Sequence, residues 1–189
     1  EDRKLEDRSL DARMMRKQQA RAALKTELGI SETATLIVQI GSGFKVKGVD
    51  RALHAIASLP AEVRATLRYL LVGSGKPVAY LKLAKKLGIA AQVSIVGGRD
   101  DVPQLLAAAD LMLHPAYRES AGYTLLEAVV AGLPVLATET CGYAYHIRQA
   151  NAGVVCPEPF SQDTLNKLLA DTLGKLPTAD WSANGLAYG

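Results

Sequence analysis

The sequence has few aromatic residues and few cysteines, and each shortage excludes a class of function. Only 5% of the 189 residues are aromatic although 49% are hydrophobic, so Ala, Leu and Val must supply most of the packing. Too few rings remain for the stacking platforms of a single-strand nucleic-acid binder. The two cysteines, Cys141 and Cys156, lack the spacing of a metal site or a disulfide framework.

Targeting segments and surfaces of one charge are missing as well. No secretory signal and no apolar run of membrane-spanning length is present, so we expect a cytoplasmic protein. Lysine and arginine total 22 against 19 acids, and the basic residues are spread along the chain instead of forming a stripe. We therefore expect no nucleic-acid partner.

The length of the chain fits one well-buried domain, which we place at residues 29–189. Residues 1–28 form a charged, amphipathic helical lead-in without an acid between Ala12 and Thr26. Such a run is usually a solvated helix face, and a weak contact with anionic lipid headgroups is the alternative. The chain starts at Glu1 and ends at Gly189 without a stop signal, so we expect a fragment of a longer protein. The basic residues of the lead-in are Arg13, Arg16, Lys17, Arg21 and Lys25.

Short apolar runs alternate with helical patterns along the rest of the chain, which predicts a repeated strand-helix-strand unit. Continuously apolar strands indicate a sheet that is covered on both faces, so we expect an α/β fold with a Rossmann-like open parallel sheet of about six strands. The expected strands are residues 36–40, 67–72, 93–96, 111–113, 134–137 and 154–155. The expected helices are residues 49–58, 77–87, 102–109, 124–131, 144–150 and 162–173.

Ligands of an open parallel sheet bind beyond the carboxyl ends of the strands. Four loops that follow strands carry unusual residues, and we expect them to converge on one crevice. These loops are residues 41–48, 73–76, 97–101 and 114–122.

Glu119 and Glu127 stand eight positions apart, on a polar loop and on the helix that follows it. The start of a helix presents unpaired amides and a positive dipole end, which together suit a phosphate. Gly122 leaves room for that anion, Glu127 can reach the hydroxyls of an attached ribose, and Glu119 can reach the sugar beyond the phosphates. The competing interpretation is a capping box, in which Thr124 caps the helix and Glu127 bonds back to it.

Lys47 and Gly73 belong to two further loops at the same edge. Lys47 follows the turn Gly41-Ser42-Gly43, where its ammonium can meet a diphosphate, although loop lysines are more often solvated. Gly73 begins a Gly-Ser-Gly-Lys sequence that lacks the spacing of a P-loop, and is either a tight turn or a wall of the nucleotide pocket. His114 is more often a hydrogen-bonded wall residue than a catalyst. Cys141 has no neighbouring base that could activate it.

Several of these stretches resemble retaining glycosyltransferases with the GT-B fold, family 4, and within that family the lipopolysaccharide-core glucosyltransferases. The resemblance covers residues from about 36 to 165. It rests on the spacing of Glu119 and Glu127 and on four further stretches. These are residues 41–51, 108–117 and 131–136, with Cys141-Gly142-Tyr143.

The resemblance implies a C-terminal, donor-binding half that works without a metal ion. Its donor is a UDP-hexose or a UDP-N-acetylhexosamine, and its acceptor, the core heptose, is met through an N-terminal domain absent from this chain. Lys47 and Glu119 take the catalytic positions, and Arg99 lies beside the uracil unless it pairs with Asp100 at the surface. The implied nucleotide-sugar contacts are Ser42, Gly43, Lys47, Gly73, Arg99, Glu119, Ser120, Ala121, Gly122, Tyr123, Thr124 and Glu127.

One departure and two rival functions remain. Family members often place an arginine after the first glycine of the lysine loop or beside the lysine, where this chain has Ser42 and Val46. One phosphate contact is therefore missing or supplied elsewhere. An NAD-dependent oxidoreductase would share the sheet, but Val46 stands where its third glycine is required. A non-catalytic nucleotide-sugar sensor is the other alternative.

The enzymes that the chain resembles act on a lipid-linked acceptor, so a peripheral position at the cytoplasmic face of the inner membrane is a further expectation.

Overall fold

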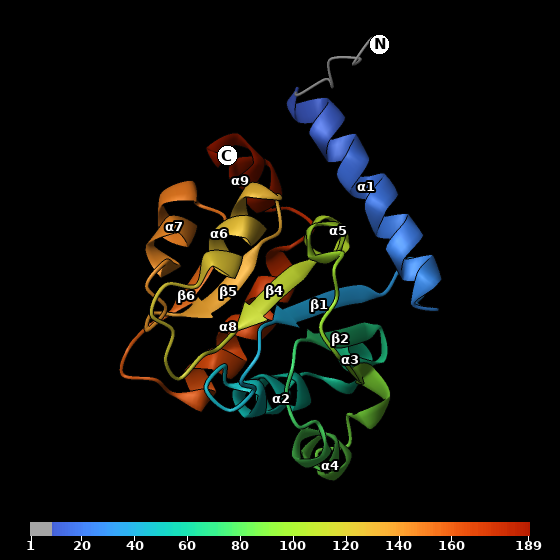
Figure 1. Ribbon diagram of the computed structural model, residues 1–189, viewed down its shortest axis with the longest axis vertical. Helices are drawn as coiled ribbons and strands as arrows, with labels where there is room; N and C mark the ends of the chain where they lie inside the picture. The colour runs from blue at the N-terminus through green and yellow to red at the C-terminus, as the bar shows by residue number, and fades with distance from the viewer. Residues whose placement is uncertain (1–8) are drawn as a thin grey trace.

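The protein is built around one open sheet of six parallel strands (Figure 1). The structure, a computed structural model, describes residues 9–189; the first eight residues of the expected lead-in lie outside this range. The strands lie in the order β3-β2-β1-β4-β5-β6, so the expected parallel α/β fold is confirmed. They are β1 (Thr35–Ile40), β2 (Leu67–Val72), β3 (Val93–Val96), β4 (Leu111–His114), β5 (Val135–Thr138) and β6 (Gly153–Cys156).

Helices cover both faces of the sheet. One face carries α1 (Leu10–Glu27), α5 (Val102–Ala108), α6 (Tyr123–Val130), α7 (Ala144–Ala150) and α9 (Trp181–Tyr188). The opposite face carries α2 (Val49–Ala57), α4 (Val78–Lys86) and α8 (Gln162–Lys175), while the short helices α3 (Ala61–Ala65) and η1 (Ala90–Gln92) flank β2 and β3.

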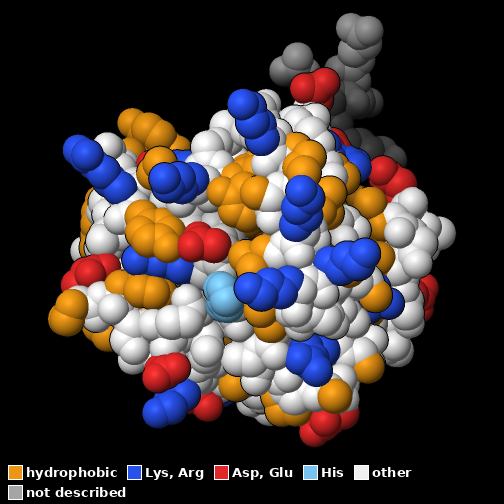
Figure 2. Space-filling model, turned by 90° about the horizontal axis from the view of Figure 1, so that it is seen from below, with side chains coloured by type: hydrophobic (Ala, Val, Ile, Leu, Met, Phe, Trp, Pro, Cys, Tyr) orange, Lys and Arg blue, Asp and Glu red, His pale blue; other side chains and the backbone are white. Residues whose placement is uncertain are grey.

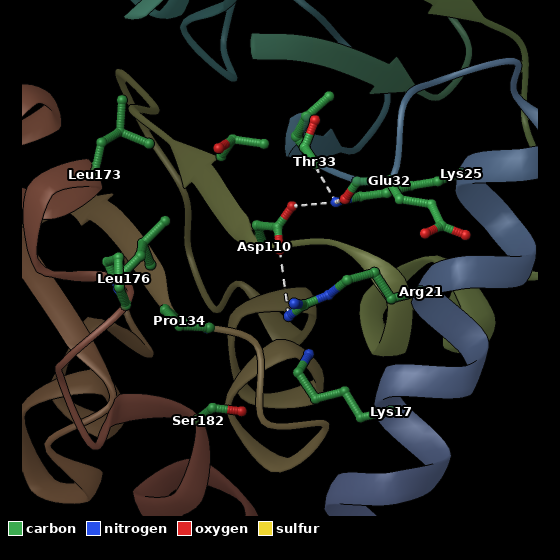
Figure 3. Close-up of a pocket in the computed structure, with 13 residues that line it drawn as sticks. Lys17, Arg21, Lys25, Glu32, Thr33, Asp110, Pro134, Leu173, Leu176 and Ser182 are labelled. Carbon is green, nitrogen blue, oxygen red and sulfur yellow. Dashed lines mark hydrogen bonds and ion pairs between the residues drawn. The ribbon is translucent and has the colours of Figure 1, made fainter. Parts of the chain in front are cut away.

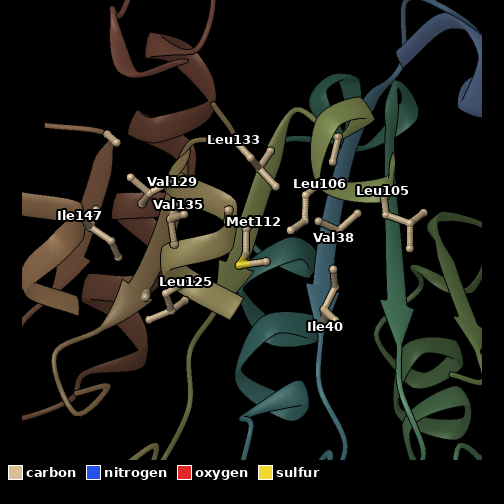
Figure 4. Packing of buried hydrophobic residues seen from close by; sticks show 14 of the residues in the cluster. Val38, Ile40, Leu105, Leu106, Met112, Leu125, Val129, Leu133, Val135 and Ile147 are labelled. Atoms are coloured by element: carbon tan, nitrogen blue, oxygen red, sulfur yellow. The ribbon is translucent and has the colours of Figure 1, made fainter. Parts of the chain in front are cut away.

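Two hydrophobic cores lie on the two sides of the sheet. Along β1, Val38 and Ile40 belong to the core under α5 and α6, whereas Ile37 belongs to the core under α2 and α8. Figure 4 shows the first of these cores, in which Met112 of β4 lies between the helices and the sheet. Each fully buried aliphatic side chain contributes about 1.5–3 kcal/mol, so the continuously apolar strands account for much of the stability.

The residues at the helix ends explain where some of the helices begin and end. Gly88 and Gly132 follow α4 and α6 with positive φ angles, as a C-terminal stop requires. Pro77 precedes α4 as its N-cap residue instead of occupying its first turn. Asp101 stands at the N-cap of α5 but makes no capping hydrogen bond, because its carboxylate binds Arg99. Helices α3 and α9 were not predicted from the sequence.

Basic side chains form no continuous stripe on the face that Figure 2 shows. Lysines and arginines stand apart on this face, with hydrophobic and uncharged surface between them. In the part of the chain that the structure describes, no helix combines the length and the apolar character that crossing a bilayer requires.

Candidate functional site

The candidate site lies where the strand order reverses, between β1 and β4. Because all six strands are parallel, the loops that follow them all leave the sheet on the side of the strands' carboxyl ends. Loop 41–48 contacts two of the other three there. It accepts a hydrogen bond from the Tyr117 amide at the Val46 carbonyl, at 2.9 Å, and it also binds loop 73–76. The Ser74 amide donates to the Ser42 hydroxyl at 3.2 Å, and the Gly43 amide donates to the Ser74 carbonyl at 3.3 Å. The fourth loop, residues 97–101, makes no recorded hydrogen bond to the others within residues 9–189.

An ion pair between Lys47 and Glu119 joins the loop after β1 to the loop after β4. The Lys47 ammonium contacts the Oε2 atom of Glu119, and the two side chains are 21% and 15% exposed. The side chain of Lys47 runs past Gly41, whose missing Cβ leaves it space. The two residues expected to act on the donor are therefore brought together across 72 positions of sequence.

Two buried polar residues hold the Lys47 loop, and the sequence analysis did not find them. The side-chain amide of Gln39 donates to the Lys47 carbonyl at 2.8 Å, and the Tyr69 hydroxyl donates to the Gln39 side-chain oxygen at 2.6 Å. Both side chains are completely or almost completely buried, and burial raises the pKa of Tyr69. Gln39 is the one polar residue within the apolar run of residues 36–40, which is the signal that could have revealed it.

Backbone contacts fix the position of Glu119 from the other side. The Gly142 amide donates to the Glu119 carbonyl at 3.1 Å, and the Tyr143 amide donates to the Ala121 carbonyl at 2.7 Å. His114 and Lys47, which lie beside the carboxylate, lower the pKa of Glu119 from its ordinary 4.5 to about 2, while partial burial acts in the opposite direction. Glu119 is thus a carboxylate at neutral pH.

The start of α6 presents a row of free backbone amides beside this pair. Gly122 is the N-cap residue of α6, with φ at 84°, and it makes no side-chain cap. A Cβ on Gly122 would lie 3.2 Å from the Cγ atom of Glu119. Among the described residues, no hydrogen-bond acceptor faces the amides of residues 120–124, the expected phosphate contacts. These amides and the dipole of α6 are available to an anion.

The capping-box interpretation of Glu127 is wrong. Helix α6 begins at Tyr123 with Gly122 as its N-cap, so Thr124 lies inside the first turn. Glu127 is exposed, and no partner for its carboxylate is found in the described part of the chain. Its side chain is therefore free to contact a ligand about one turn from the amides.

Arg99 does not point at the ion pair in this structure. Its guanidinium binds the Asp101 carboxylate at 2.6 and 2.7 Å and the Glu27 carboxylate of α1 at 3.1 Å. The expectation that Arg99 pairs with Asp100 at the surface is therefore wrong. These two carboxylates raise the pKa of Arg99, and the exposed location means that the pairs add little stability.

His114 and Cys141 are both buried next to Glu119. The Nε2 atom of His114 lies 3.5 Å from the Oε2 atom of Glu119, and neither ring nitrogen has a hydrogen-bond partner. The expectation of a hydrogen-bonded wall residue was therefore right about burial and wrong about hydrogen bonding. Burial raises the pKa of the Cys141 thiol to about 11, which agrees with its exclusion as a nucleophile. Within residues 9–189, no three His, Cys, Asp or Glu side chains are grouped so that they could hold a metal ion.

A hollow of about 290 Å³ lies at the opposite end of the strands from the candidate site (Figure 3). Its wall is formed by α1, by residues next to the starts of β1, β4 and β5, and by residues of α8, α9 and the segment between these two helices. In this fold ligands bind at the carboxyl ends of the strands, so this hollow is not the donor site. Asp110 pairs there with Arg21 and Lys25 at 3.2 Å each.

The basic side chains of α1 bind the body of the protein, so the solvated-face expectation is wrong for four of them. Arg13 donates to the carbonyls of Val130 and Leu186 at 3.2 and 2.6 Å, and Lys17 donates to the Ala107 carbonyl at 3.1 Å. Burial lowers the pKa of Lys17 from 10.5 to about 8. The acceptor carbonyls belong to the last turns of helices, where a cation is stabilised by the dipole. Arg21 and Lys25 are the other two basic residues of α1 that are bound in this way, through their ion pairs with Asp110.

Comparison with known proteins gives the family. Residues 20–181 match the family model described as glycosyl transferases group 1. The lipopolysaccharide glucosyltransferase WaaG of Escherichia coli (strain K12) is 48% identical over 170 residues, which cover 89% of this chain and 46% of that protein. The N-acetyl-alpha-D-glucosaminyl L-malate synthase of Bacillus anthracis is 40% identical over 134 residues, which cover 70% of this chain and 35% of that protein. The chain thus spans less than half the length of these relatives.

Solved structures agree with the sequence relatives. The crystal structure of WaaG, a glycosyltransferase involved in lipopolysaccharide biosynthesis, matches with a TM-score of 0.87 and 48% identity over 89% of this chain and 46% of that chain. Anabaena Alr3699/HepE in complex with UDP-glucose matches with a TM-score of 0.74 and 26% identity over 89% of this chain and 47% of that chain. The fold is that of the C-terminal half of a GT-B glycosyltransferase. The chain belongs to the group 1 glycosyl transferases.

Proposed function

We propose that this chain is the donor-binding half of a retaining glycosyltransferase that transfers a hexose from a UDP-sugar to the inner core of lipopolysaccharide. The observation that carries this proposal is the Lys47–Glu119 ion pair at the strand-order switch, next to the free amides of α6. A cation and a row of amides suit a diphosphate, and a carboxylate beside them suits the hydroxyls of the attached sugar. The name of WaaG and the UDP-glucose complex of HepE support the same donor and product class.

The residues of the site have separate tasks in this reaction. Lys47 and the amides of residues 120–124 stabilise the negative charge that develops on the leaving diphosphate. Glu127 accepts hydrogen bonds from the ribose diol. Glu119 holds sugar hydroxyls and places the anomeric carbon for attack from the face of the leaving group. The donor is a UDP-hexose or a UDP-N-acetylhexosamine, and this scheme requires no metal ion.

Recognition of the base and of the acceptor extends the proposal beyond the ion pair. For Arg99 to lie beside the uracil, its side chain has to release Glu27 or Asp101, both of which it now binds. The heptose acceptor is met by a second domain, as in two-domain relatives, so we expect the isolated chain to bind donor with little turnover.

A cytoplasmic location and a weak contact with the inner membrane stay predictions, and flotation with acidic vesicles tests the contact.

Ligand-induced thermal stabilisation tests the donor site most directly. Because a ligand that binds only the folded state raises its stability, UDP and UDP-glucose should raise the melting temperature, while GDP-mannose should have a smaller effect. NAD should have none, and stabilisation by NAD alone would overturn the proposal. UDP-N-acetylgalactosamine extends the panel to the second donor class.

Two lysine variants show whether the ligand sits at the ion pair. Lys47→Met should abolish the stabilisation by UDP, whereas Lys45→Met should preserve it, because Lys45 is exposed two positions away and has no partner in the described residues. Equal effects of the two variants would place the diphosphate elsewhere. A chimera with the N-terminal half of the E. coli relative then tests transfer, with Glu119→Ala as the inactive control. Donor binding by that chimera without any transfer would favour a non-catalytic sensor.

A further inference from the structure

His114 is a buried polar residue without a partner. It ends β4, its side chain is 2% exposed, and both ring nitrogens lack a hydrogen bond. A buried polar group left without a partner costs about 1–3 kcal/mol, so it calls for an explanation. Here the Oε2 atom of Glu119 lies 3.5 Å from Nε2, which is too long for a hydrogen bond.

The carboxylate oxygen nearest to His114 is already occupied by Lys47. The Lys47 ammonium contacts Oε2 of Glu119. His114 faces the same oxygen atom but makes no hydrogen bond to it. Lys47 is 21% exposed and extends from a loop along Gly41, where no side chain confines it. A diphosphate at the amides of α6 would carry two negative charges and would compete with the single charge of Glu119 for this ammonium.

We propose that His114 is a positioning residue that takes over the Glu119 carboxylate when a bound diphosphate draws Lys47 away. Without Lys47, a carboxylate that is only 15% exposed would lose its countercharge. The imidazole then binds a proton from solvent and donates Nε2–H to Oε2, while the other carboxylate oxygen remains for a sugar hydroxyl. This inference rests on the proposed function and adds that donor binding takes up a proton.

Few of the side chains around the His114 imidazole could take up the proton in its place. Lys47 and Glu119 face it from the loops after β1 and β4, and Cys141 lies on the loop after β5. Cys141 stays a neutral thiol, since burial raises its pKa to about 11. Arg51 of α2 is held by the carbonyls of the two residues after His114, at 3.4 and 3.2 Å. Among these groups, the imidazole of His114 is the side chain whose chemistry suits taking up a proton at neutral pH.

Calorimetry in several buffers measures the proton directly. UDP-glucose is titrated into the protein at pH 7.5 in phosphate, HEPES and Tris, whose ionisation enthalpies differ. The diphosphate diester of this ligand has no proton to lose near pH 7, so the slope of binding enthalpy against ionisation enthalpy counts protons bound by the protein. We expect a non-zero slope that corresponds to net uptake of protons by the protein. Binding with zero slope would overturn the inference, whereas absence of binding would instead refute the proposed function.

Histidine variants assign the proton to His114. His114→Gln keeps a hydrogen-bonding group but cannot titrate, so it should bind UDP-glucose without proton uptake. In His114→Phe the affinity for UDP-glucose should fall roughly tenfold, while the affinity for UDP, which has no sugar for Glu119 to hold, should change less than about threefold. Equal losses for the two ligands would indicate a merely structural role.

An NMR titration of protein that keeps His114 tests the proposal even if the His114 variants fail to fold. The chain has three histidines, so His54→Gln and His146→Gln identify the third imidazole signal in proton–carbon NMR spectra by elimination. Its apparent pKa should rise by about one unit or more when UDP-glucose is added. An unchanged titration in the saturated complex would contradict the partner exchange.

Discussion

Gly48 packs its Cα against the Pro115 carbonyl, and this contact joins the loop after β1 to the loop after β4. A Cβ built on Gly48 would overlap the Pro115 oxygen, and its φ of 70° also disfavours any other residue. Together with the bond from Gln39 to the Lys47 carbonyl, this contact holds the Lys47 loop close to Glu119. A side chain at Gly48 would therefore disturb the geometry of the switch point.

Replacing Gly48 by alanine should damage both stability and donor binding. We expect Gly48→Ala to lower the free energy of unfolding by about 2 kcal/mol or more and to abolish thermal stabilisation by UDP-glucose. Gly88→Ala is the matched control, because Gly88 has φ at 72° but no atom within 4 Å of its Cβ position. The control should cost about 1 kcal/mol in urea denaturation and keep donor binding. Equal costs would mean that the loop contact is unimportant.

Loss of the Glu127 carboxylate should affect binding and not stability. Because Glu127 caps no helix, Glu127→Ala should change the unfolding free energy by less than about 0.5 kcal/mol. Loss of a charged hydrogen bond to the ribose should weaken UDP binding by about tenfold or more in calorimetry. Asp171→Ala on α8, also an exposed helix carboxylate, is the control that should leave UDP affinity unchanged. If Glu127→Ala binds UDP as the wild type does, no ribose contact exists.

Acid should weaken the fold through Glu119. The folded-state pKa of about 2 lies below the ordinary 4.5, so Glu119 contributes stability that is fully present above pH 5 and is lost as the pH falls toward 2. The shift corresponds to at most about 3 kcal/mol. Urea unfolding between pH 5 and 2 should therefore show a smaller loss of stability for Glu119→Gln than for the wild type. Parallel pH profiles for the two proteins would show that Lys47 and His114 do not lower the pKa of Glu119.

Lys17 should destabilise the fold at neutral pH. Its pKa is lowered to about 8, so the unfolded chain binds more protons than the folded protein between pH 8 and 10.5, and stability rises with pH over that window. Lys17→Met should increase the unfolding free energy at pH 7 by roughly 1–2 kcal/mol, with a smaller gain at pH 10. Lower stability of Lys17→Met at both pH values would show that the bond to the Ala107 carbonyl outweighs the burial of charge.

Much of the fold could be predicted because its determinants are local. Continuous apolar runs gave five strands to within one residue at each end, and β6 was predicted as the inner two of its four residues. The rule that ligands bind beyond strand ends selected the loops of Lys47 and Glu119. The start of α6 was predicted one residue late, because the left-handed φ angle of Gly122, which precedes the helix, is not visible in sequence.

The missed features depend on partners that are distant in sequence. Tyr69 and Gln39 are 30 positions apart, and nothing local connects them to the loop of Lys47. The basic residues of α1 lacked acidic neighbours and so resembled a solvated face, but most of their acceptors are backbone carbonyls, which every residue has. Arg99 had two adjacent aspartates, and only the path of the loop selects Asp101.

The ion pair of Lys47 and Glu119 also determines how donor affinity should respond to ionic strength. An entering diphosphate has to displace an internal anion before it gains the ammonium, so measured affinity is the difference between two attractions. Salt screens both of them. Affinity for UDP-glucose should therefore vary less with added salt than the charge of the ligand alone suggests, and charge-neutral replacement of Glu119 should restore the steeper dependence.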